Sequence, residues 1–125
     1  MVKTIVSIIC AVVILSVGAV FEDNFVHKQF GDFYNVLDVL YEKIENFEAT
    51  EKDVLAVQDN WLNKKKNLHA FIPHTEIKEV DLWLSETITL VRDKEWTDAL
   101  SKVEVLKELA EQIPKTFEMR LQNIL

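Results

Sequence analysis

Glycine, proline and cysteine are all scarce in this sequence of 125 residues, which has two glycines, two prolines and one cysteine. Glycine and proline form most tight turns, so their scarcity favours a few long helices. A single cysteine, Cys10, leaves no disulfide within the chain. Helix packing alone must therefore stabilise the fold.

Basic charge is also in short supply. The 14 lysines and arginines are outnumbered by 21 acidic residues, which gives a net charge of −7. The chain has no basic stripe for phosphate contacts, so we predict no binding to nucleic acid. An acidic surface is compatible with solubility and with attraction of cations.

The common catalytic motifs are missing as well. The sequence has no glycine-rich phosphate loop, no nucleophile elbow and no glutamate–histidine zinc helix. A small bundle has little concave volume in which to desolvate one of its many carboxylates. We therefore expect a protein that is not an enzyme and that has no cofactor.

A long apolar run lies near the amino end. Residues 5–21 begin with Ile5, end with Phe21 and contain no charge. As a helix they reach about 26 Å at ~1.5 Å per residue, which is close to the short end of what spans a hydrocarbon core. Residues 1–21 are thus predicted to contact a membrane. Lys3 precedes the run, and the positive-inside rule places the amino end in the cytoplasm and the rest of the chain outside it.

Two versions of this prediction compete. In the first, the run is a single-pass anchor, because it is longer than a usual signal segment and continues to Phe21. In the second, a signal peptidase cuts near Ala19, where small residues occur, and the protein is secreted. A buried cytosolic helix is a third alternative, but the segment has no polar face. Cys10 follows Ile9, so lipid modification is not expected.

Beyond residue 21, apolar residues recur at intervals of three and four, which is typical of amphipathic helices. The first stripe ends near Phe47, and Thr50 with Asp53 resembles a capping box that starts a second helix. Pro73 should end this second helix. The first two stripes consist of Val26, Phe30, Phe33, Leu37, Leu40, Ile44 and Phe47, and of Val54, Val57, Trp61, Leu68 and Ile72.

A third helix should follow Pro73 at once, with His74 or Thr75 as its cap. A fourth helix should start at Trp96 and close at Pro114, and a short amphipathic tail should lie back on the bundle. Short connections make sequential helices antiparallel neighbours. The predicted fold is all-α: a transmembrane or signal helix (residues 1–21), then an antiparallel up-and-down bundle of about four helices with a short C-terminal helical tail (residues 22–125).

Several motifs resemble those of a known family. They are Trp61 followed by three lysines at 64–66, the run Phe71-Ile72-Pro73-His74-Thr75-Glu76-Ile77, and the ending Leu121-Gln122-Asn123-Ile124-Leu125. The order of these motifs after an apolar anchor resembles an uncharacterised bacterial family, known only as a domain of unknown function. The Phe-Ile-x-His-x-Glu-Ile run is its most specific part. The resemblance implies small anchored or secreted helical proteins, and it implies no activity, ligand or catalytic residue.

Two groups of residues are candidate sites. His69, His74 and Glu76 lie close together in the sequence and offer imidazole and carboxylate ligands for zinc or copper, although the spacing matches no helical ligand pair. Their alternative role is structural, as helix cap and exposed helical residues. Leu82 and Trp83 are candidates for a partner surface if both are exposed. Trp61 and Trp96 lie on apolar stripes and are predicted to be core residues.

We expect a membrane-tethered interaction or assembly module that acts outside the cytoplasm, beside an integral membrane protein. The alternative is a secreted helical bundle that binds a metal ion or a small ligand. The sequence predicts neither the oligomeric state nor the identity of the partner.

Overall fold

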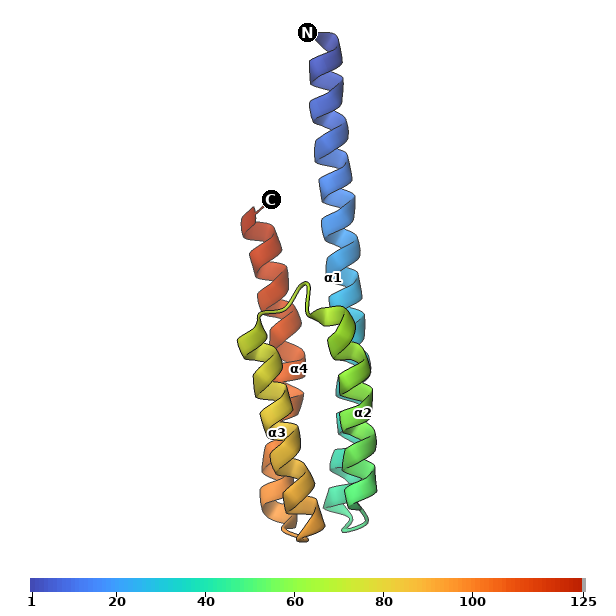
Figure 1. Cartoon of the computed structure of the whole chain (residues 1–125), viewed down its shortest axis with the longest axis vertical. Coiled ribbons are helices and arrows are strands. Elements are labelled where there is room, and N and C mark those ends of the chain that lie inside the picture. The colour runs from blue at the N-terminus through green and yellow to red at the C-terminus, as the bar shows by residue number, and fades with distance from the viewer. Residues whose placement is uncertain (125) are drawn as a thin grey trace.

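A computed structural model describes residues 1–124 (Figure 1). Within these residues the protein has four helices and no strand, which confirms the predicted all-α class. The helices are α1 (Val2–Glu45), α2 (Glu51–Leu68), α3 (His74–Arg92) and α4 (Trp96–Ile124).

Helix α1 joins the apolar run to the bundle without interruption. It continues through residues 21 and 22, where the sequence changes from apolar to charged. Figure 1 shows its amino-terminal half projecting alone beyond the other helices. Of the helices that the structure describes, α1 is the one long and apolar enough to cross a membrane, and its most apolar window is 0% buried. The first predicted bundle helix is therefore the second half of α1.

The carboxyl-terminal half of α1 packs on α2 and α4, and α3 packs on the same two helices, in an up-and-down bundle, as predicted (Figure 1). Trp61 is buried in the core, where its ring centroid is 5.0 Å from that of Phe33. The buried apolar residues come from all four helices and from two connections: Val26, Phe30, Phe33, Leu37, Leu40, Ile44, Ala49, Val54, Val57, Trp61, Leu68, Ile72, Ile77, Val80, Leu84, Val91, Ala99, Val103, Leu106, Ala110, Ile113 and Phe117.

The α1–α2 and α3–α4 turns lie at the same end of the bundle and share their backbone geometry. Phe47 and Lys94 have positive φ angles of 59° and 58°. In each turn the next residue donates its N–H to a carbonyl five positions earlier, as Glu95 does to Leu90. The Phe47 and Trp96 rings meet edge to face at 6.0 Å, so the two turns are in contact. Trp96 is partly buried there and lies outside the central core.

The start of α2 confirms the predicted capping box. Thr50 Oγ1 accepts a hydrogen bond from the backbone N–H of Asp53, and the Asp53 carboxylate accepts one from the Thr50 N–H at 2.8 Å. The Thr50 N–H holds the pKa of the Asp53 carboxyl below its usual range, and Lys43 adds to this effect. The reciprocal bonds satisfy amides that a helix start leaves without partners.

The start of α3 differs from the prediction, in which His74 or Thr75 was the cap. Pro73 is the N-cap residue, with φ −56°, and no side chain caps the helix. The Pro73 carbonyl instead accepts from the N–H groups of Glu76 and Ile77. The fixed φ of proline already places the chain at the entry to a helix, so a side-chain cap is not required to start it.

The prediction that Pro114 closes the fourth helix was wrong. Helix α4 continues through Pro114 to Ile124, so the predicted tail is part of it. Proline removes one helical hydrogen bond and costs about 3 kcal/mol in a helix interior. Pro114, Ile113 and Phe117 are all buried. Their packing on the bundle offsets this cost.

Candidate functional site

The end of the bundle that faces the apolar half of α1 is closed by three aromatic side chains. Phe71, from the connection between α2 and α3, contacts Phe25 of α1 and Phe117 of α4 with ring centroids 6.0 and 6.2 Å apart. We call these three residues the aromatic cap. Edge-to-face pairs of this kind contribute about 0.5–1.5 kcal/mol beyond the area they bury. The aromatic cap therefore fixes the connection and α4 against the base of the apolar segment.

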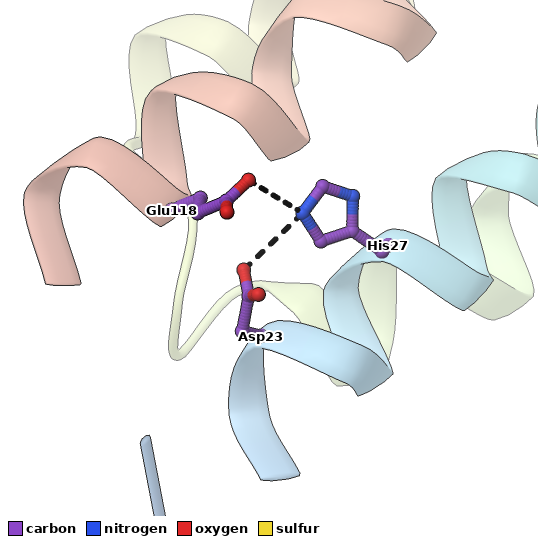
Figure 2. Close-up of side chains that lie close together, drawn as sticks. All are labelled: Asp23, His27 and Glu118. Carbon is purple, nitrogen blue, oxygen red and sulfur yellow. Dashed lines mark ion pairs between the residues drawn. The ribbon is translucent and has the colours of Figure 1, made fainter. Parts of the chain in front are cut away.

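Beside the aromatic cap, one histidine and two carboxylates converge (Figure 2). Asp23 and His27 lie one turn apart on α1, and Glu118 reaches them from α4. His27 Nε2 is 3.3 Å from Asp23 Oδ1 and 3.4 Å from Glu118 Oε2. The three ligand atoms all lie within 4.8 Å of one another. We call this group the junction triad.

Two carboxylates face one imidazole nitrogen, which carries at most one N–H. That N–H can serve both oxygens only as a weaker, shared three-centre bond. Asp23 Oδ1 is buried and has no hydrogen-bond partner in the described residues, although it lies close to His27. A cation among the three atoms would attract both carboxylates and the nitrogen lone pair together.

The distances are compatible with zinc. Bonds of ~2.0–2.1 Å in a tetrahedral site place neighbouring ligand atoms roughly 3.3 Å apart, close to the two distances from His27. The side chains of Asp23, His27 and Glu118 are 24%, 39% and 44% exposed, so solvent can supply further ligands. Three protein ligands with a fourth open position are typical of non-structural zinc sites.

A second feature lies between α1 and α2, where a groove of about 290 Å³ opens at the surface. Its lining is mostly apolar, and Val39 is 57% exposed at its edge. Asn60 also lines the groove, and its side-chain oxygen is buried without a hydrogen-bond partner in the described part of the chain. We call this feature the α1–α2 groove.

Comparison with known proteins identifies the family. Residues 20–124 match the family described as "Domain of unknown function (DUF4363)". The chain belongs to this family. The match covers the whole bundle and starts at the end of the apolar segment, which confirms the resemblance drawn from the sequence motifs.

Among curated proteins, this DUF4363 chain is similar to an adenylate dimethylallyltransferase of Dictyostelium discoideum, with 32% identity over 89 residues. The alignment covers 67% of this chain and 30% of that protein, so the chain spans less than a third of its length. No solved structure matches.

The structure does not place the predicted metal ligands of this DUF4363 chain in one group. The rings of His69 and His74 stack with centroids 6.4 Å apart. Glu76, however, pairs with Arg120 of α4 at 3.3 Å. Among the described residues, the group that brings three such ligands together is the junction triad.

The two predicted partner-surface residues are exposed to different extents. Leu82 is 57% exposed. Trp83 is partly buried against the core, and the Lys102 ammonium lies 4.6 Å from its ring centroid. Adjacent helical residues point about 100° apart, so one of the two faces the bundle more than the other.

Sequence reasoning missed the junction triad, and only part of it could have been found. Asp23 and His27 are four residues apart, a spacing that places two side chains on one helix face. Glu118 lies 91 positions after His27 in the chain, as the two numbers show. Nothing local to Glu118 indicates that it meets α1, because its position depends on the packing of α4.

Proposed function

We propose that this protein is a membrane-anchored interaction module, with residues 2–21 in the bilayer and the four-helix bundle outside the cytoplasm. The observation that carries the proposal is the continuity of α1. One helix contains both an apolar half without packing partners and a half that forms the bundle core. An apolar helix exposed along its whole surface needs a lipid environment.

Continuity also affects how a partner would meet the bundle. No turn or proline interrupts α1 between its apolar half and its core half. The bundle therefore stands as an extension of the membrane segment, with the Phe47–Trp96 contact at its far end. A protein held in this way presents its sides to neighbouring membrane proteins at a fixed distance from the bilayer.

The α1–α2 groove is the surface best suited to such a partner. It combines exposed Val39 with the Lys43–Asp53 ion pair, whose side chains are 46% and 26% exposed. Apolar contact area supplies affinity, and charged groups at the edge supply selectivity. Leu82, on α3, offers a second exposed apolar contact.

Topology can be tested with single cysteines in a chain in which Cys10 is replaced by alanine. Glu79→Cys, on the exposed face of α3, should react with a membrane-impermeant maleimide in intact cells. Thr4→Cys, which keeps the basic residue Lys3, is the matched control and should react only after lysis. Recovery of the unprocessed chain as a soluble cytosolic species would refute the anchor.

Interaction can be tested with a photo-crosslinking amino acid at Val39 in intact membranes. We expect one discrete adduct at Val39 and none at Gln112, which is also exposed but lies on α4 away from the groove. Equal labelling at Val39 and Gln112, or no adduct at either position, would argue against an interaction through the groove.

Metal binding is a second candidate function, favoured by the junction triad. Titration of the full-length chain with zinc, copper and calcium should give stoichiometric heat with zinc or copper. His27→Ala should abolish this heat, whereas His69→Ala should leave it unchanged. Loss of the heat in His69→Ala but not in His27→Ala would instead indicate that the metal binds at His69, His74 and Glu76. Absence of heat with every ion would mean that the junction triad is an ion-pair cluster that binds no metal.

A further inference from the structure

We infer that residues 119–124, the last turns of α4, form a second membrane contact, inserted at the interface of the bilayer that holds the apolar segment of α1. This inference rests on the proposed anchor, because the position of the bilayer is taken from it. The partner is a lipid surface, and the contacting groups are apolar side chains that extend beyond the end of the bundle core.

The junction triad sets the level of α4 relative to α1. Glu118 pairs with His27, and its carboxylate lies within 4.8 Å of the Asp23 carboxylate, so this turn of α4 lies beside residues 23–27. The two helices are antiparallel (Figure 1). Ile124 follows Glu118 by about six residues, or roughly 9 Å of helix. It therefore lies near the level of Ala19, inside the apolar segment that ends at Phe21.

The other helices end before this level. Figure 1 shows the last turns of α4 rising past the connection between α2 and α3, beside the projecting half of α1. Phe71, in that connection, is level with Phe25 through their ring contact. Of the described elements other than α1, α4 thus reaches furthest toward the proposed bilayer.

The side chains of these turns suit a membrane interface. Phe117, 7% exposed, is the last buried residue of α4. Leu121 and Ile124 continue the same stripe at intervals of four and three, yet Ile124 is 79% exposed and Met119 is 63% exposed. The apolar stripe of α4 therefore extends beyond the end of the buried core.

Charge is consistent with the same placement. The chain is strongly acidic, with 21 aspartates and glutamates, yet residues 119–124 contain none of them. Arg120, the one charged residue there, is held by Glu76 at 3.3 Å on the side of the bundle. Interfacial helices bury their apolar side chains by roughly 5–10 Å, which is comparable with the reach of α4 beyond Glu118.

The contact can be measured with an environment-sensitive nitrobenzoxadiazole label on single cysteines in the Cys10→Ala chain. The full-length protein is reconstituted in phosphatidylcholine–phosphatidylglycerol vesicles that carry a quencher at a shallow or a deep position of the acyl chain. The labelled variants are Ile124→Cys, Ile14→Cys in the apolar segment and Phe47→Cys at the far end of the bundle. All three positions are exposed, so the label does not disturb the core.

We expect the label at Ile124 to emit at shorter wavelength than the label at Phe47, and to lose fluorescence to the shallow quencher. The label at Ile14 should lose fluorescence to the deep quencher, and the label at Phe47 to neither. Quenching at Ile14 without quenching at Ile124 would overturn the second contact while leaving the anchor intact. Absence of quenching at Ile14 would instead refute the anchor itself.

Self-association is the alternative to the membrane contact, because a second copy of the chain could cover the same side chains. If α4 packed against a second copy of the chain, the label at Ile124 would also shift to shorter wavelength. Neither lipid quencher would then reduce its emission, and the shift would decline as protein is diluted in lipid. That combination would overturn the membrane contact.

Discussion

The indole N–H of Trp61 donates to Asp81 Oδ1 at 2.8 Å, and this bond joins the core of α2 to α3. The other carboxylate oxygen accepts from Lys65 Nζ at 2.7 Å. Trp61 is 1% exposed, so its indole N–H depends on this acceptor at the edge of the core. One aspartate thus satisfies a buried donor and holds one of the lysines of the 64–66 run.

Replacement of Asp81 by alanine should destabilise the bundle by about 1–3 kcal/mol, because the buried indole N–H is left without an acceptor. The measurement is urea unfolding of the full-length protein in detergent, followed by circular dichroism. Asp59→Ala, the same change at an exposed position of α2, is the control and should change stability by less than about 0.5 kcal/mol. Equal effects of the two changes would show that the Trp61 bond does not contribute.

Thr50→Ala should cost about 1 kcal/mol, because it removes the oxygen that caps the start of α2. Thr50→Ser retains that oxygen and should restore most of the lost stability. The free energy of unfolding of the two variants gives the comparison. A serine variant as unstable as the alanine variant would mean that the threonine methyl group, rather than the cap, is responsible.

Acid should remove the contribution of Asp53 to stability. The Thr50 N–H lowers the folded-state pKa of Asp53 below 3.8, so the folded protein favours the carboxylate more than the unfolded chain does. The resulting stabilisation is fully present above pH 3.8 and is lost as the pH falls through the lowered folded-state pKa. Asp53→Asn should therefore be less stable than wild type at neutral pH, and the difference should shrink in acid. A difference that is constant with pH would contradict this linkage.

Pro114→Ala should stabilise the protein by about 1 kcal/mol. Alanine regains about 3 kcal/mol of helix propensity and a hydrogen bond to the carbonyl of residue 110, and it loses roughly 1.6 kcal/mol of burial for two methylene groups. Thermal unfolding monitored by circular dichroism measures the balance. Pro73→Ala is the contrasting control and should not stabilise, because Pro73 precedes the first turn of α3, where the missing N–H of proline breaks no helical hydrogen bond. Destabilisation by Pro114→Ala would indicate that α4 needs the shape that proline imposes.

Local patterns were sufficient to predict most of the helices. The capping box at Thr50 and Asp53 identified the start of α2, and Pro73 identified the connection before α3. Each of these signals acts within about one helical turn, so a reader of the sequence needs no knowledge of the neighbouring helices. The prediction at Pro114 failed for the same reason. The sequence shows that proline destabilises a helix interior, but it does not show that Pro114 is buried beside Ile113 and Phe117.

The candidate site was less predictable than the fold. The sequence drew attention to His69, His74 and Glu76 because they are close in the chain, whereas the structure brings His27 to Glu118 across the bundle. Leu82 and Trp83 are neighbours in the sequence, yet helical geometry exposes one and covers much of the other. Proximity along the chain is a poor guide to proximity across a bundle.

The amino-acid sequence by itself determined the all-α class, the apolar run of residues 5–21 and the stripes that form the core, because hydrophobic periodicity is a local property. Tertiary structure alone decided that α1 is continuous from that run into the bundle, and that α4 continues past Pro114 until Glu118 pairs with His27. These features depend on how whole helices align and pack. That alignment is the sum of many weak contacts between residues far apart in the chain.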